Sequence, residues 1–136
     1  MPWTRSVGLP SETGTPWPSL PQVPGFPKAA FNDLDSVKAL ISDQTVAVML
    51  EPIQGEAGII VPPAGWLIGL RRICDAHNVL LILDEVQTGL GHTGRMFAAE
   101  HWGLEPDLMP VAKSLSGGYV PVGALLMSNA VYDAVF

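Results

Sequence analysis

The apolar run Val79–Leu83 is followed directly by two acids, Asp84 and Glu85. A short apolar run bounded by polar residues is typical of a buried strand, and this strand would carry both carboxylates at its C-terminal end. Lys113 follows the next apolar run and has small residues and glycines beside it. An acid and an amine placed together in this way suit a cofactor that needs a charged partner and an imine-forming lysine. The alternative is two buried strands whose polar ends face solvent.

Predicted helices and strands alternate along the chain, which is the pattern of an α/β fold. The helices are expected from Asn32 or Asp33 to about Ile41, from Gly65 to near His77, and as a short helix near Met96–His101. The strands are expected at Thr45–Leu50, Val79–Leu83, Asp107–Val111 and Gly123–Met127. Only about ten residues join the last two strands, fewer than the crossover between parallel strands needs. We therefore predict an open, mostly parallel sheet with one antiparallel strand.

The helix after Gly65 is amphipathic. Its spacing predicts one apolar face and one polar face. The apolar face would hold Trp66, Leu67, Leu70, Ile73, Cys74 and His77, and the polar face Arg71, Arg72 and Asp75. His77 is near the helix end, where an imidazole interacts favourably with the helix dipole, and this role is preferred over a catalytic one.

Residues 1–31 hold more than half of the chain's 13 prolines and show no apolar periodicity. We predict an extended segment without regular structure there, and a folded unit over residues 32–136. A structureless stretch of that length is unusual within a compact domain. Either it wraps a partner surface or the chain is part of a longer protein.

Composition excludes several classes of function. The net charge of −6 and the absence of a basic stripe argue against nucleic acid or anionic membrane as partners. No apolar run has transmembrane length, and the first residues lack the apolar centre of a secretory signal. The lone cysteine, Cys74, can form no internal disulfide, which is compatible with a reducing cytosol. We expect a cytoplasmic protein without a metal site.

Glu51, Asp84 and Lys113 each follow a predicted strand. In an open α/β sheet, ligands bind at the C-terminal ends of the strands, so these three residues should converge on one site. A carboxylate at Asp84, next to a buried strand, persists when it faces a cation such as a protonated pyridine nitrogen. Gln87 would donate to a ring oxygen of the same cofactor. The alternatives are a turn cap for Asp84 and a solvated loop lysine for Lys113.

Two nucleotide-binding patterns resemble parts of this sequence. An apolar strand ending in Asp-Glu also describes a Walker B strand, and Leu115–Gly118 matches the Leu-Ser-Gly-Gly of ABC transporters. The chain has no G-x-x-x-x-G-K-[ST] loop to hold phosphates, and its Leu-Ser-Gly-Gly follows the acidic strand instead of preceding it. A nucleotidase is therefore disfavoured.

Residues from about Phe31 to the end resemble the class III aminotransferases, which are pyridoxal-phosphate enzymes of fold type I. The likeness is nearest to the ornithine, acetylornithine and diamine transaminase branch. The motifs that carry it are Asn32-Asp33-Leu34, Glu51–Gly58, Leu83–Gly89, Pro106-Asp107 and Ala112–Gly118, with Pro121 and Gly123-Ala124. The resemblance implies that residues 32–136 are part of the cofactor-binding large domain.

The resemblance also implies roles for four residues. The lysine matching Lys113 forms the Schiff base with pyridoxal phosphate and carries the proton between substrate and cofactor. The aspartate matching Asp84 pairs with the pyridine nitrogen, and the glutamine matching Gln87 contacts the ring hydroxyl. The glutamate matching Glu56 is the partner of a substrate-gating arginine, whereas Glu51 and Glu56 by themselves are also compatible with solvated positions.

The sequence departs from the family pattern in places. Pro2 stands where the family has an aromatic residue, Thr4 where it has glycine, and His92 where it usually has arginine. The family's phosphate-binding loop and C-terminal domain have no counterpart here, so the chain corresponds to the middle of the large domain. We predict an incomplete fragment of a transaminase that moves an amino group from an amino acid or amine to a 2-oxo acid, homodimeric in its full-length parent. The alternative is a non-catalytic relic that binds the cofactor weakly or not at all.

Overall fold

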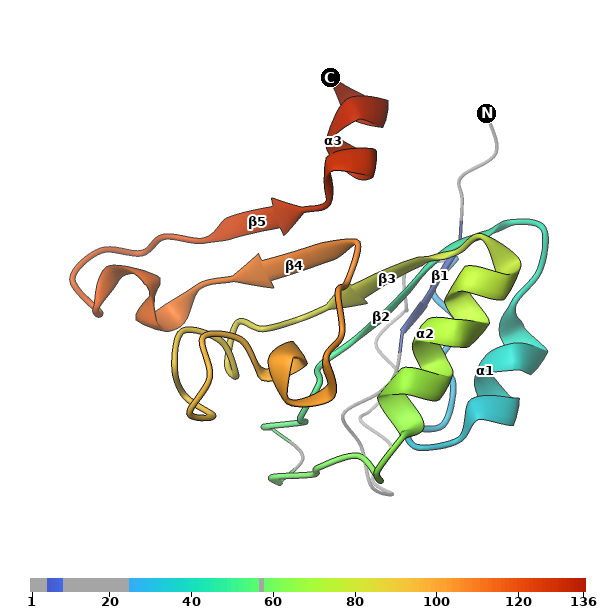
Figure 1. Cartoon of the computed structure of the whole chain (residues 1–136), viewed down its shortest axis with the longest axis horizontal. Coiled ribbons are helices and arrows are strands. Elements are labelled where there is room, and N and C mark those ends of the chain that lie inside the picture. The colour runs from blue at the N-terminus through green and yellow to red at the C-terminus, as the bar shows by residue number, and fades with distance from the viewer. Residues whose placement is uncertain (1–4, 9–24, 57) are drawn as a thin grey trace.

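The computed structural model describes residues 5–8, 25–56 and 58–136, with side-chain detail from residue 25 onward. Within these residues, five strands form one sheet in the order β1-β2-β3-β4-β5. The neighbours from β1 to β4 are parallel, and β4 and β5 are antiparallel (Figure 1). The strands are Arg5–Gly8 (β1), Thr45–Leu50 (β2), Leu80–Leu83 (β3), Leu108–Val111 (β4) and Ala124–Met127 (β5).

Helices connect or follow these strands. The α-helices are Leu34–Leu40 (α1), Trp66–His77 (α2) and Asn129–Val135 (α3), and the 3₁₀ helices are Ala98–Trp102 (η1) and Lys113–Ser116 (η2). The predicted α/β fold, the mostly parallel sheet and the antiparallel last pair are all confirmed. Helix α3 was not predicted.

The expectation that residues 1–31 lack regular structure is wrong at Arg5–Gly8. This short segment forms the edge strand β1 and pairs in parallel with β2. It contains no proline, so its backbone donors are free to join a ladder, whereas the prolines that dominate the surrounding composition lie outside it. Residues 9–24, which hold several of those prolines, lie outside the described residues.

Helix α1 begins where the sequence predicts, and the structure decides between its two candidate caps. The Asp33 side chain accepts hydrogen bonds from the backbone N–H groups of Asp35 and Ser36, each at 3.0 Å. These bonds satisfy two of the donors that every helix start leaves free. Asn32, the other candidate, has a left-handed backbone with φ of 65° and makes no cap.

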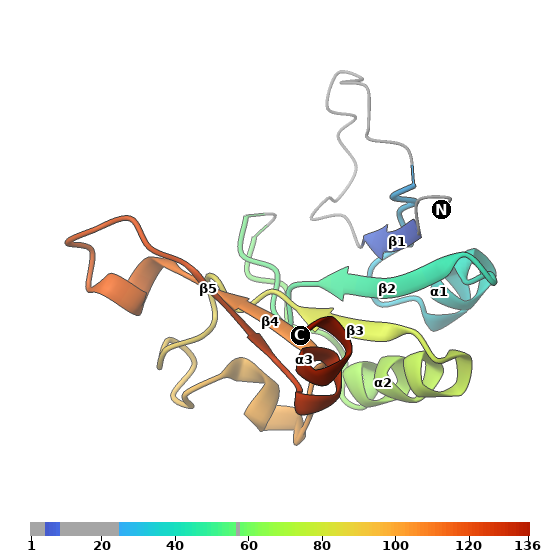
Figure 2. The same ribbon diagram turned by 90° about the horizontal axis from the view of Figure 1, so that it is seen from above.

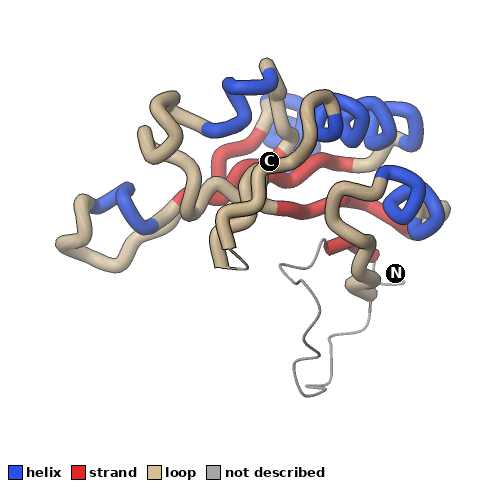
Figure 3. Tube along the Cα trace, turned by 90° about the horizontal axis from the view of Figure 1, so that it is seen from below, coloured by secondary structure: helices blue, strands red, loops and turns tan. Residues whose placement is uncertain are grey.

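The core lies between the helices and one face of the sheet. Figure 3 shows α2 and η1 on the same side of the strands. Leu50 and Leu83 are register partners in β2 and β3, and both are buried in the same cluster as Leu67 and Leu70 of α2. Side chains alternate between the two faces of a strand, and the buried Leu81 and Leu83 of β3 follow that alternation. The opposite face is more open, since Met49 is exposed there.

The predicted faces of α2 are confirmed for Trp66, Leu67, Leu70, Ile73 and Cys74, which are buried. Two residues depart from the prediction. His77, the last residue of α2, is exposed instead of facing the core. Arg71 does not point freely into solvent.

Arg71 ties helix α2 to the segment before β4. Its guanidinium lies 2.7 Å from Asp107 and 2.8 Å from Asp75. The same Asp107 oxygen accepts from the backbone N–H of Leu81, also at 2.7 Å. Burial by itself would lower the pKa of Arg71, but the bond to Asp107 and the nearby charges raise it overall, so the guanidinium keeps its charge. One carboxylate thus links α2, β3 and β4.

Cys74 provides a test of how tightly α2 packs on the sheet. Burial raises the pKa of its thiol from 9.0 to about 11, mainly through desolvation. The unfolded chain therefore releases this proton at lower pH than the folded chain does. The contribution of the neutral thiol is fully present below pH 9 and is lost as the pH rises towards 11, by up to about 3 kcal/mol.

We expect urea unfolding to show a steeper loss of stability between pH 9 and 11 in the unchanged chain than in Cys74→Ala. Below pH 9 the variant has lower stability because it creates a cavity, but it lacks this thiol titration. If the free energy of unfolding fell equally with pH in both proteins, the thiol would not be buried in the folded chain.

Candidate functional site

The loops that follow β2, β3 and β4 lie at one edge of the sheet (Figure 2). These three strands are parallel, so their C-terminal ends point the same way. The predicted convergence of the residues after the strands therefore follows directly from the topology. Helices α1 and α2 lie towards the other end of the strands and take no part in this edge.

Lys113, Gln87 and Gly55 come from the three different loops and meet at this edge. The Lys113 ammonium donates a hydrogen bond to Gln87 Oε1. A Cβ added to Gly55 would lie 2.1 Å from Gln87 Nε2, so the Gln87 side chain occupies the space that any larger residue at 55 would need. The loop after β2, at Gly55, therefore lies directly against the Gln87 side chain that Lys113 contacts.

Lys113 also has an unusual backbone. Its φ of 46° lies in the left-handed region, which side-chain-bearing residues adopt at a cost of order 1 kcal/mol. It is the first residue of η2, directly after β4. Strain of this kind persists when the surrounding contacts fix the conformation, and it is frequent where a side chain must be aimed at a ligand. The amine is exposed to solvent.

Asp84 lies three residues before Gln87, at the end of β3, and is half-buried. Its backbone N–H donates to Leu50 O at 2.8 Å, which extends the β2–β3 ladder to the start of the loop. One carboxylate oxygen, Oδ1, accepts from Val86 N–H at 3.0 Å, so the turn-capping alternative is realised in part. Among the described residues, Asp84 and Lys113 form no salt bridge, and the loop joins them through Gln87.

Glu85 is the residue of this region that sequence reasoning did not assign. It is only 1% exposed. Its carboxylate accepts from Thr88 Oγ1 at 2.5 Å and from the backbone N–H groups of Ala98 and Ala99 at 3.0 and 2.8 Å. Its own N–H donates to Pro110 O on β4 at 3.1 Å. The neighbouring acids thus face different environments, since Glu85 anchors the loop to η1 and leaves Asp84 at the edge.

The acids after β2 have separate positions. Glu51 accepts from the backbone N–H of Gly55 at 2.8 Å and so closes its own loop. Glu56 is exposed and forms no ion pair with a described residue. Glu56 has no arginine partner within the described part of the chain, and its gating role stays a prediction.

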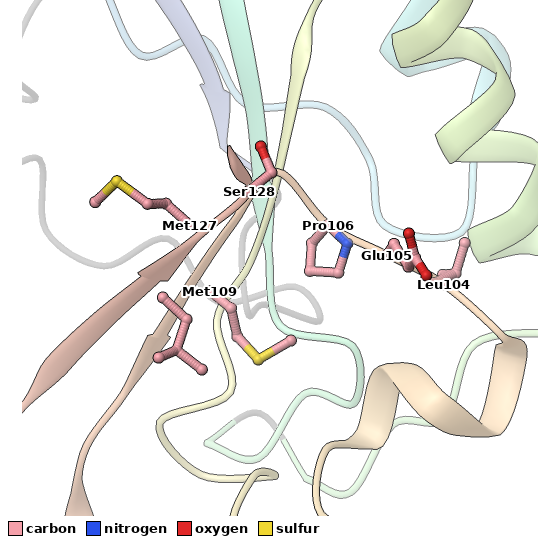
Figure 4. A pocket seen from close by; sticks show the side chains of 7 residues that line it. Leu104, Glu105, Pro106, Met109, Met127 and Ser128 are labelled. Atoms are coloured by element: carbon pink, nitrogen blue, oxygen red, sulfur yellow. The ribbon is translucent and has the colours of Figure 1, made fainter. Parts of the chain in front are cut away.

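A pocket elsewhere on the molecule is not part of this site. It lies between the segment Leu104–Pro106 and the end of β5 at Met127 and Ser128, with Met109 beside it (Figure 4). Because β4 and β5 are antiparallel, this is the N-terminal end of β4, and Lys113 follows the opposite end. The residues described contain no group of three or more metal-ligating side chains. None of the helices described has the length and apolar character to cross a bilayer.

Comparisons with known proteins agree with this arrangement. A sequence model of the class-III aminotransferase family matches residues 15–136. Putrescine aminotransferase of Pectobacterium atrosepticum is 45% identical over 97% of this chain, and acetylornithine aminotransferase 2 of Bordetella pertussis is 52% identical over 93% of it. These matches cover 30% and 33% of the two relatives.

Solved structures give the same result. Ornithine δ-aminotransferase of Plasmodium falciparum has a TM-score of 0.87 at 34% identity, covering 99% of this chain and 33% of its own. Acetylornithine aminotransferase of Elizabethkingia anophelis has a TM-score of 0.85 at 35% identity, covering 98% and 33%. The chain spans about a third of the length of the relatives it matches. With a family model that matches most of its residues, the chain belongs to the class-III aminotransferase family.

Proposed function

We propose that this chain is the part of a transaminase that binds pyridoxal 5′-phosphate. The parent enzyme would transfer an amino group from an amino acid or amine, such as ornithine, acetylornithine or a diamine, to a 2-oxo acid. The observation that carries the proposal is the contact between the Lys113 amine and Gln87, three residues after Asp84, in a chain of this family.

The residues at the edge fit the chemistry of the cofactor. Pyridoxal phosphate, when bound, supplies an electron sink that stabilises negative charge at the substrate α-carbon. Its binding needs an amine, a carboxylate opposite the ring nitrogen and a donor for the ring hydroxyl. Lys113, Asp84 and Gln87 are of these three kinds and come from adjacent loops.

Each residue has a role that its environment supports. Lys113 would hold the cofactor covalently through Nζ and afterwards carry a proton to and from the substrate α-carbon. Asp84 has one oxygen engaged by Val86 and the other available to keep a pyridine nitrogen protonated. Gln87 accepts from Lys113 through Oε1, which leaves its amide N–H groups as donors.

The proposal also covers the role of Glu56 and the place of residues 32–136 in the parent enzyme. Glu56 would pair with a substrate-gating arginine, and its exposed position at the same edge is compatible with that role. Residues 32–136 would belong to the large domain of a homodimeric, cytoplasmic parent. Several apolar residues of the C-terminal segment are exposed, among them Tyr119 and Leu125, as expected of a surface that other parts of a larger assembly cover.

The relic hypothesis has its own support. Lys113 is exposed, as are Gly117 and Gly118 beside it, so bulk water reaches the amine. A water-exposed imine hydrolyses, and a charge-assisted hydrogen bond contributes only ~1.5–3 kcal/mol. We therefore expect the chain by itself to bind the cofactor weakly and not to catalyse efficient transamination.

The chain's three lysines allow a direct test. Lys28, Lys38 and Lys113 are all exposed, but only Lys113 lies beside Gln87. The chain is incubated with pyridoxal phosphate, the imine is reduced with borohydride, and the modified residue is identified by peptide mass spectrometry. The proposal predicts preferential labelling of Lys113 at low cofactor concentration. Equal labelling of all three lysines would contradict it and favour the relic.

A further inference from the structure

We propose that His92 is a positioning residue, which fastens the segment carrying Lys113 to the loop carrying Asp84 and Gln87. The proposal rests on the proposed function for its consequence at Lys113, but the fastening itself is a property of the folded chain. His92 lies in the turn-rich stretch after β3, and Ser114 follows Lys113 directly.

The imidazole of His92 bridges the two loops with both ring nitrogens. Nδ1 lies 2.8 Å from Gly89 O, and Nε2 lies 3.1 Å from Ser114 Oγ. A carbonyl oxygen only accepts, so Nδ1 carries the proton. In the neutral ring Nε2 then accepts from the Ser114 hydroxyl. Because a hydroxyl both donates and accepts, the contact also forms with the protonated ring.

The near end of this bridge is anchored in the core. Gly89 N–H donates to Glu85 O at 2.9 Å, and Glu85 is the buried acid whose side chain is held by η1. A Cβ on Gly89 would lie 2.8 Å from Glu85 O, so the two backbones pack directly against each other. The Gly89 carbonyl is therefore a fixed point for the imidazole.

The Ser114 end of this bridge lies next to Lys113, the residue with the left-handed backbone. Lys113 contacts Gln87, and Ser114 contacts His92, so two successive residues are bound to one loop. Two such contacts restrict rotation of the segment about the end of β4. The left-handed backbone of Lys113 needs neighbours that fix it, and the His92–Ser114 contact supplies one of them. Without it, the amine would sample a wider range of directions.

The test combines three variants with one matched control. His92→Ala removes both hydrogen bonds, Ser114→Ala removes one partner, and His92→Gln keeps a donor and an acceptor at similar reach. His101 is the control, because its imidazole also bonds a loop residue, Thr93, and the described residues show no hydrogen bond from it to the 112–118 segment. All these histidines are exposed, so the variants should fold.

The first readout is the rate at which Lys113 forms an imine with pyridoxal phosphate, followed by its visible absorbance. Loss of one or two modest hydrogen bonds predicts a rate about threefold to tenfold lower in His92→Ala and in Ser114→Ala. The double variant His92→Ala/Ser114→Ala should be no slower than His92→Ala alone, because both substitutions remove the same His92–Ser114 contact. His92→Gln should recover most of the rate, and His101→Ala should leave it unchanged.

The second readout needs no cofactor. Amide hydrogen exchange of residues 113–117 is expected to be faster in His92→Ala and unchanged in His101→Ala. Unchanged exchange in His92→Ala would overturn the proposal. Faster exchange with an unchanged rate of imine formation would overturn the positioning role at Lys113. If Lys113 of the unchanged chain forms no imine, the proposed function fails, and hydrogen exchange alone decides whether His92 fastens the segment.

Discussion

Replacing Lys113 by alanine is expected to abolish the visible absorbance that the chain gains with pyridoxal phosphate. That absorbance arises from a covalent bond between the cofactor aldehyde and a lysine amine, and Lys113 is the lysine beside Gln87 at the carboxyl edge of the sheet. The remaining lysines lie far along the chain from this edge, in the segment before α1 and within α1. Neither lysine lies on the loops that carry the carboxylate of Asp84 and the amide of Gln87.

Lys38→Ala is the matched control, because Lys38 is also exposed and its amine has a partner, Asp35 at 3.4 Å. Its removal should leave the band intact, whereas Lys113→Ala should show only the spectrum of the free cofactor. The measurement is a titration of each protein with pyridoxal phosphate, followed by absorbance. A band of equal strength in Lys113→Ala would mean that another amine reacts and that Lys113 is wrongly assigned.

Replacing Glu85 by alanine is expected to lower the free energy of unfolding by about 3 kcal/mol or more. Three buried donors lose their acceptor together, namely Thr88 Oγ1 and the N–H groups of Ala98 and Ala99. Each unpaired buried donor costs roughly 1–3 kcal/mol. The total is a large part of the 5–15 kcal/mol that stabilises an ordinary domain. Urea unfolding followed by circular dichroism measures the difference.

Glu100 provides the matched control for Glu85. It is an exposed acid that caps the same 3₁₀ helix, accepting from Phe97 N–H at 2.8 Å. Water replaces this partner when the side chain is removed, so Glu100→Ala should cost only about 1 kcal/mol. Similar losses for the two variants would show that Glu85 is not a buried anchor. Because Glu85 holds the loop of Asp84 and Gln87, its loss should also weaken cofactor binding.

Much of the fold was predictable because it depends on local patterns. The limits of β2 follow from a continuous run of apolar and β-branched residues, and those of α2 from an apolar period of 3.6 residues. The Asp33 cap follows from residue type. The antiparallel β5 follows from the short connection after β4. The short strand β1 was missed because the composition around it is dominated by proline, and composition averages over neighbours.

The order of residues is sufficient to predict that acids, an amine and glycines follow three parallel strands and meet at one edge, because strand direction alone sends the strand ends there. Which of these groups touch one another depends on the tertiary packing. Gln87 became the partner of Lys113, and Glu85 turned inward beside an outward Asp84, because neighbouring residues at a strand end point in opposite directions. Arg71 found Asp107 across 36 positions of sequence, a pairing that no local pattern encodes. Contacts between residues far apart in the sequence depend on how the helices and strands pack, and that packing depends on the whole chain.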